Sequence, residues 1–150
     1  MRLHLGVIDV TYHLPTGKGR RRRSRAGRTS TGDVANFLEK RYGVMETFFS
    51  VHSRDVVQAM ESSLSGALEN LLLGAPTTGT SFGAATSEVE RQFRQFLSNR
   101  EMDGLPGVPT QAAQRGVNRR LKVRRGAMRP SYIDTGLYQQ SFTAWVDDAA

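Results

Sequence analysis

The chain has 150 residues and a net charge of +7, from 21 Lys and Arg against 14 Asp and Glu. This length is about that of one ordinary domain. The absence of cysteine excludes disulfides, thiolate nucleophiles and cysteine-based zinc sites. No apolar run approaches the roughly 18 residues that a membrane span needs, and no secretory signal is visible, so we expect synthesis in the cytoplasm.

A strand is predicted over residues 2–13, where apolar residues alternate along the chain. The alternating residues fall into two sets, first Leu3, Leu5 and Val7, then Ile8, Val10 and Tyr12. The phase changes near Gly6, which predicts either a β-bulge there or a strand that is buried on both faces.

Residues 14–32 form a Gly-rich basic segment. Its cations are Lys18, Arg20, Arg21, Arg22, Arg23, Arg25 and Arg28. Such a segment cannot bury enough apolar surface to offset its ordering entropy, which predicts a projecting loop or hairpin arm. Three surroundings remain open for these cations: DNA phosphates, an acidic surface of a neighbouring subunit, or solvent.

A long helical pattern follows, with Asp33 as its predicted N-cap. Apolar residues recur at helical intervals for some 40 residues, up to Gly74-Ala75-Pro76. This predicts either one rod about 60 Å long or two helices broken around Ser50–Ser53. The large apolar residues on it are interpreted as packing residues: Phe37, Met45, Phe48, Phe49 and Met60. If the helix extends beyond the domain, other chains must cover part of this face.

The second half of the chain predicts shorter helices. Ser87 and Glu90 have capping-box spacing at the start of one that ends by Met102–Gly104. Its apolar face consists of Val89, Phe93, Phe96 and Leu97. Thr110 is the predicted cap of another helix, which runs to Leu121. A second basic stretch overlaps the end of that helix, with Arg119, Arg120, Lys122, Arg124, Arg125 and Arg129.

Residues 141–146 alternate like a strand that can pair with residues 2–13. The whole predicts a single α+β domain over residues 1–150. In it, a long central helix or two helices, with shorter helices, pack on a small antiparallel sheet formed by the N- and C-terminal strands. The basic segment 14–32 projects from this domain.

Catalytic motifs are not apparent. The three histidines lack metal-ligand spacing: His4, His13 and His52. Gly17-Lys18 resembles the end of a phosphate-binding loop but lacks the earlier glycine and the following Ser or Thr. Adjacent acids such as Asp147 and Asp148 do not face one another, so they fit solvated charge better than acid–base catalysis. We therefore expect no enzyme activity, no cofactor and no small-molecule substrate.

The run from Arg129 to Val146 resembles neck and tail-completion proteins of tailed bacteriophages, in which an Arg-Pro segment leads into a Thr-Gly-Leu turn, a serine and a strand. The residues that carry this motif are Pro130, Thr135, Gly136, Leu137, Ser141 and Trp145. Two further runs, 41–49 and 67–76, resemble structural proteins of contractile-tailed phages. The likeness covers roughly residues 34–146.

The motif also makes physical sense by itself. Pro130 fixes an extended approach and Thr135-Gly136 permits a turn. Leu137 is expected to anchor this turn beneath the strand that carries Phe142 and Trp145.

The resemblance implies a virion subunit, made in the host cytoplasm, that forms a homo-oligomeric ring in the tail. Its position would be at the neck or near the baseplate, with tube, sheath, neck or baseplate proteins as partners. The long arginine segment departs from the neck pattern. The alternative function is a nucleic-acid-binding accessory protein whose two basic segments contact DNA phosphates.

Overall fold

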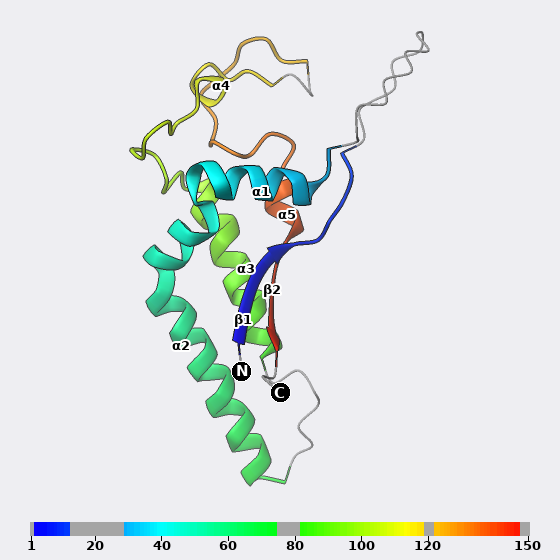
Figure 1. The fold of residues 1–150 in the computed structure, drawn as a ribbon. Coiled ribbons are helices and arrows are strands. Elements are labelled where there is room, and N and C mark those ends of the chain that lie inside the picture. Colours follow the sequence, from blue (N-terminus) through cyan, green and yellow to red (C-terminus); the bar gives the residue numbers. More distant parts are fainter. Residues whose placement is uncertain (1, 13–28, 75–81, 119–121, 148–150) are drawn as a thin grey trace.

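The computed structural model describes residues 2–12, 29–74, 82–118 and 122–147. The elements in chain order are β1 (Arg2–Val7), α1 (Thr31–Tyr42), α2 (Val44–Leu72), α3 (Gly83–Ser98), α4 (Gln111–Gln114), α5 (Leu137–Ser141) and β2 (Phe142–Asp147). The mixed fold with a sheet of terminal strands is confirmed (Figure 1). The cations predicted for the projecting segment, Lys18 to Arg28, lie outside the described residues.

The sheet consists of β1 and β2, which pair antiparallel from Arg2 opposite Asp147 to Val7 opposite Phe142. β1 ends at Val7, earlier than predicted. Its register is regular through Gly6 and none of its residues is buried, so both predicted alternatives, a β-bulge and a strand buried on both faces, are wrong. Gly6 instead leaves room for a ring, because a Cβ there would lie 3.0 Å from the Trp145 side chain.

The segment after β1, residues 8–10, is hydrogen-bonded to the start of α1. The backbone N–H of Thr31 donates to the Val10 carbonyl at 2.9 Å, and the Thr31 hydroxyl donates to the Ile8 carbonyl at 2.6 Å. Ser30, not Asp33, is the N-cap. Asp33 is the third helical residue, and its carboxylate accepts the Ser30 N–H at 3.0 Å, which completes a capping box.

The long helical pattern forms two helices that meet at Gly43. Gly43 has φ 57°, a left-handed conformation that glycine adopts without steric cost and that ends α1. The break predicted around Ser50–Ser53 is found there as a kink inside α2, at His52, whose backbone angles are not helical. His52 Nε2 lies 2.7 Å from a Glu101 carboxylate oxygen, so the kink is tied to the segment that follows α3.

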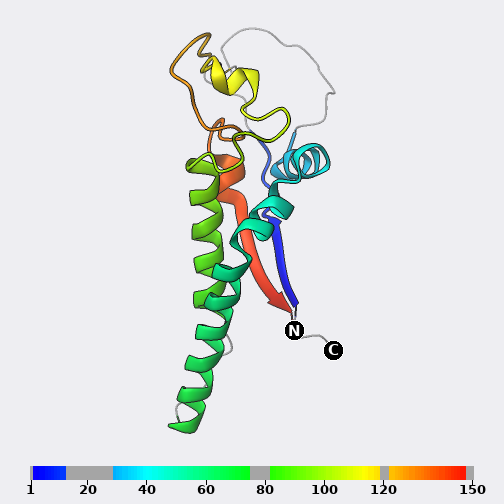
Figure 2. The same cartoon turned by 90° about the vertical axis from the view of Figure 1, so that its left-hand side faces the viewer.

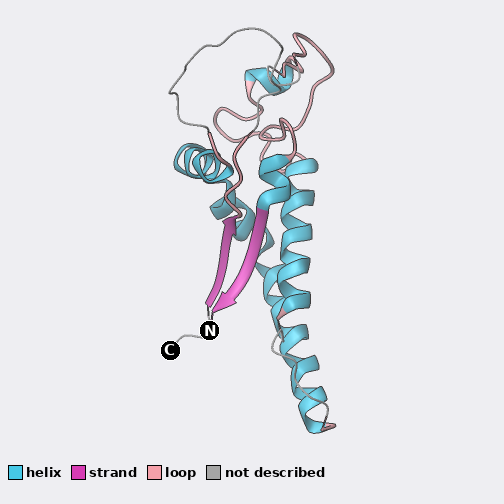
Figure 3. Ribbon diagram, turned by 90° about the vertical axis from the view of Figure 1, so that its right-hand side faces the viewer, coloured by secondary structure: helices cyan, strands magenta, loops and turns pink. Residues whose placement is uncertain are grey.

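The core lies where α3 packs between α2 and the sheet, and Figures 2 and 3 show the strands on one side of α3. Four phenylalanines at its centre are fully buried: Phe48, Phe93, Phe96 and Phe142. The Phe93 and Phe142 rings stack with centroids 3.8 Å apart. The prediction that Phe37 and Phe49 are packing residues is wrong, because their side chains are 56% and 46% exposed.

The predicted start of α3 is wrong by several residues. The helix begins at Gly83, so Ser87 and Glu90 lie inside it. The Glu90 carboxylate does not cap the helix. It accepts hydrogen bonds from the Thr143 hydroxyl and the Ala144 N–H of β2. Glu90 therefore joins α3 to the sheet.

The helix after Thr110 is much shorter than predicted. Thr110 caps it as expected, with its hydroxyl accepting the Ala113 N–H at 3.3 Å. The helix ends at Gln114, and Gly116 then has φ 60°. A Cβ at Gly116 would clash with the Ala127 carbonyl oxygen. The backbone at Gly116 therefore packs directly against the backbone of residues 126–127, and only glycine fits.

Candidate functional site

The far half of α2, residues 57–72, carries large apolar side chains into solvent. Figure 1 shows this part of the helix running past the ends of the strands. None of these sixteen positions is buried. We call the following five residues the distal stripe; their side chains are 46% to 86% exposed: Val57, Leu64, Leu68, Leu71 and Leu72.

The distal stripe has a definite direction. At about 100° per residue, four of its residues fall within an arc of about 60° around the helix axis: Val57, Leu64, Leu68 and Leu71. The opposite side, which is half-buried, holds small residues: Ala59, Ser63 and Gly66. A helix that packs on its own core does the reverse, with large apolar residues inward. The distal stripe therefore faces away from the core formed by the described residues.

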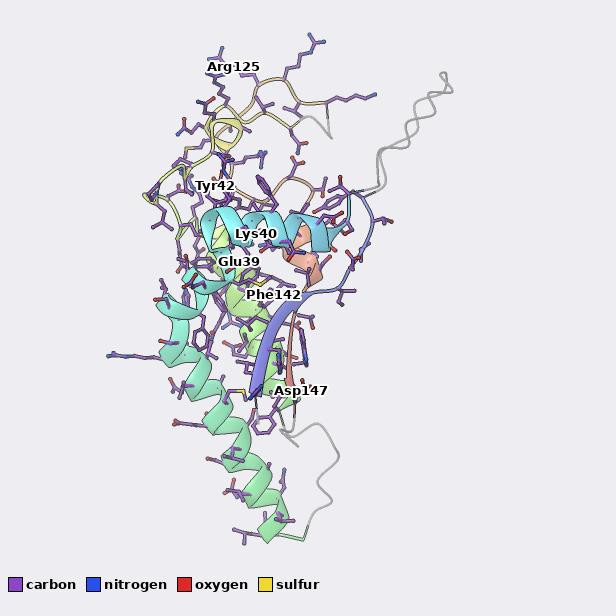
Figure 4. The ribbon with its side chains drawn as sticks, in the orientation of Figure 1. Glu39, Lys40, Tyr42, Arg125, Phe142 and Asp147 are labelled. Carbon is purple, nitrogen blue, oxygen red and sulfur yellow. The ribbon has the colours of Figure 1, made fainter. Side chains whose placement is uncertain are left out.

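The opposite end of the molecule is cationic. Residues 104–133 contain no Asp or Glu. We call residues 110–129 the basic head. In it, Lys122, Arg124 and Arg125 are exposed, and no ion pair involves them within the described part of the chain. Figure 4 shows Arg125 at the outer end of the head. Arg119 and Arg120, from the same predicted stretch, lie outside the described residues.

Arg129 differs from the other cations of the head because its guanidinium group is turned inward. Nη1 donates to the Ile133 carbonyl, and Nη2 donates to the Val117 carbonyl at 3.1 Å. Nη2 also lies 3.5 Å from an Asp134 carboxylate oxygen. Arg129 thus joins Val117 of the head to residues 133–134, and its guanidinium group does not project into solvent.

The motif of residues 130–145 builds the junction between the head and the sheet. Gly136 has φ 78° and precedes α5, and Thr135 Oγ1 accepts the Leu137 N–H at 3.4 Å. The Ser141 hydroxyl donates to the Leu137 carbonyl at 2.7 Å and closes this short helix. Leu137 does not anchor the turn under β2 as predicted, because it is half-buried, and the fully buried residue is Tyr138.

The remaining motif residues flank this junction. Pro130 is half-buried and precedes Ser131, whose hydroxyl accepts the Thr110 N–H at 3.1 Å. Trp145 lies on the exposed face of β2, where its ring stacks on His4 with centroids 5.3 Å apart. Trp145 therefore does not share the buried face of the strand with Phe142.

A cavity of about 280 Å³ lies between α1, α5 and the head. The sequence reasoning missed it. All four tyrosines of the chain line it, together with Phe37 and Arg129; the tyrosines are Tyr12, Tyr42, Tyr132 and Tyr138. These residues are far apart in the sequence and follow no common spacing. No local signal could have brought them together.

The described residues contain no group of three or more His, Asp or Glu side chains placed to hold a metal ion. No helix among them is long and apolar enough to cross a membrane. A comparison of the chain with protein-family models, with curated proteins and with solved structures finds no match.

Proposed function

We propose that this chain is a structural subunit of a tailed-phage particle, without enzyme activity, that assembles as a ring in the tail through protein–protein contacts. The observation that carries the proposal is the distal stripe of α2. The resemblance of residues 129–146 to neck and tail-completion proteins supplies the biological setting. It favours a place at the neck or near the baseplate, in the virion.

The apolar area of the distal stripe supports association. Full burial of a leucine or valine side chain contributes about 1.5–3 kcal/mol relative to exposure. Each of the five side chains keeps about half or more of its surface in water. Covering them together therefore provides a driving force that no contact within the described chain supplies. In a closed ring each copy covers the distal stripe of its neighbour through the same contact.

The charge distribution supports an assembly with a defined direction. The only charged residues of the distal half of α2 are Glu61 and Glu69. The basic head lies at the other end of the molecule (Figure 1). A ring repeats this polarity in every copy, so that its cations form one band. That band would face either an acidic tube, sheath or baseplate surface, or DNA in a central channel.

A second candidate function is nucleic-acid binding by the basic head. It is favoured by Lys122, Arg124 and Arg125, which are exposed and unpaired within the described residues. Contacts to phosphates alone would give binding without sequence preference, whose affinity falls steeply with salt. A salt titration with a duplex oligonucleotide tests this function. Useful affinity at physiological salt would favour it over the structural proposal.

The structural proposal is tested by analytical ultracentrifugation of the purified chain. We expect wild type to associate, and the triple variant L64S/L68S/L71S to remain monomeric. Val51→Ser is the matched control, because Val51 is equally exposed on the same helix but lies outside the distal stripe. A wild-type monomer at all concentrations, or loss of association in the control alone, would contradict the proposal. Mass spectrometry of intact particles should then find the chain in several copies.

A further inference from the structure

One acidic residue, Glu61, lies inside the distal stripe. At about 100° per residue, it falls about 20° from Leu68 on one side and about 20° from Leu72 on the other. Its side chain is exposed. The residues three and four positions away, which are its neighbours on the helix surface, carry no positive charge: Val57, Gln58, Leu64 and Ser65. A surface that covers the distal stripe therefore meets this carboxylate as well.

The charge of Glu61 restricts what that surface can be. A carboxylate that is removed from water without a partner destabilises the contact, whereas a cation beside it offsets the loss. Two distal stripes facing each other would instead bring two copies of Glu61, with like charges, into one apolar contact. A contact between identical surfaces also closes a two-fold dimer and cannot continue around a ring. The distal stripe thus requires a different surface that combines apolar and cationic side chains.

Residues 122–128 of the basic head have this combination. All seven are exposed. The two large apolar side chains, Val123 and Met128, are 39% and 42% exposed. Three cations lie beside or between them in the sequence, and no ion pair involves these cations within the described part of the chain: Lys122, Arg124 and Arg125. This segment therefore offers apolar contact to the leucines of the distal stripe and positive charge to Glu61.

Backbone hydrogen bonds fix this segment of the head. Asn118 and Val123 exchange two of them, at 2.9 and 2.8 Å. The Gly126 N–H donates to the Arg115 carbonyl at 3.2 Å. A surface whose backbone is already ordered loses less conformational entropy on association than a mobile loop does.

The two surfaces lie at opposite ends of the molecule, so that they can meet only between copies (Figure 1). We propose that the distal stripe of one copy docks on residues 122–128 of the next copy, with Glu61 beside the cations of that head. This inference rests on the proposed function and names the surface that the neighbour presents. The head has seven Lys and Arg and no Asp or Glu, so Glu61 offsets only part of its charge and the remaining cations still form the band.

Charge reversal on either side of the contact tests this inference, with the full chain and sedimentation equilibrium. Glu61→Lys and the head variant R124E/R125E should each lower the association constant at least about tenfold, because like charges then meet across the contact. A one-to-one mixture of the two variants should associate again. In the mixture the reversed stripe of the first variant meets the reversed head of the second, and their unreversed surfaces meet as in wild type.

Lys40→Glu is the matched control for net charge. Lys40 is exposed on α1, outside both surfaces, and its reversal should leave the association constant unchanged. An equal loss in this control would overturn the inference, because net charge and not a local contact would then govern association. A mixture that associates no better than either charge variant alone would overturn it as well.

Failure of this inference is distinct from failure of the proposed function. If L64S/L68S/L71S lost association while both charge variants associated like wild type, the head would not be the surface that covers the distal stripe, and the proposed function would stand. A wild-type chain that stays monomeric at all concentrations would contradict both.

Discussion

The two halves of α2 carry similar apolar patterns but meet different surroundings. In the near half, Val44, Phe48 and Val56 are buried against the core. In the far half, residues 57–72, no side chain is buried. Helical periodicity in the sequence therefore does not tell whether the chain itself buries an apolar face.

The direction of the apolar face also changes along α2. Val57 follows Phe48 by nine positions, which at about 100° each places the two side chains on opposite sides of the helix. The kink at His52 lies between them, and the His52 ring meets Phe96 edge-on with centroids 5.8 Å apart. The helix is thus held to the core as far as Val56, which is buried. From Val57 on, the residues of the distal stripe point away from that core.

The largest expected effect of a single substitution lies in the core beside the near half. Phe93→Ala removes the ring that stacks on Phe142 and meets Phe48 edge-on. We expect the free energy of unfolding to fall by about 3–5 kcal/mol, measured by urea denaturation. A loss below about 1.5 kcal/mol would mean that these rings do not form the centre of the core.

A smaller effect is expected in the head, where the cations differ in role. Arg129→Met removes the donors to the Ile133 and Val117 carbonyls, and we expect a loss of about 1–3 kcal/mol. Amide hydrogen exchange in residues 111–135 should rise. Arg125→Met is the matched control, since Arg125 is exposed, and its stability should be unchanged. Equal losses in the two variants would refute the structural role of Arg129.

The capping box of α1 predicts a loss of about 1 kcal/mol for Ser30→Ala. The Ser30 hydroxyl accepts the Asp33 N–H at 3.2 Å, and alanine leaves this donor without its cap. Thermal denaturation measures the loss. Ser30→Asp is a suitable comparison, because aspartate also caps helices and should keep most of the stability.

Asp9→Asn should have a smaller effect that depends on pH. Hydrogen bonds from the Ser30 side chain and the Gly32 N–H lower the pKa of Asp9 from 3.8. A lowered pKa in the folded state stabilises the fold above the unfolded pKa, and this contribution is lost as pH falls through the folded pKa. Wild type should therefore melt above the variant at pH 7, with the difference shrinking at acidic pH. A constant difference would exclude the ionised carboxylate as its cause.

The sequence predicted the elements whose signals are local and unopposed. The apolar face of α3, the alternation within each terminal strand and the Thr110 cap are examples. It failed where a residue serves a distant contact. Glu90 has the spacing of a capping residue but bonds β2 instead. Phe37 has helical spacing with the core residues, yet it lies exposed beside the cavity.

The candidate sites were predictable to different degrees. The exposed face of α2 was expected from the length of the helical pattern. The cavity was not, because its four tyrosines come from separate segments that only tertiary packing brings together. Charge in the sequence marked the basic head but could not separate Arg129, which bonds inward, from Arg124 and Arg125, which do not.

The smallest expected effect on the stability of the monomer belongs to the distal stripe. Leu68→Ser exchanges an exposed leucine, so the free energy of unfolding of the dilute monomer should change by about 0.5 kcal/mol or less, mostly through the lower helix propensity of serine. Association should nevertheless weaken, as measured by sedimentation equilibrium, because each copy loses an apolar contact. If the dilute monomer instead lost more than about 1.5 kcal/mol, Leu68 would be packed within its own chain. The two halves of α2 would then share one core, and the far half would have no surface left for a neighbour.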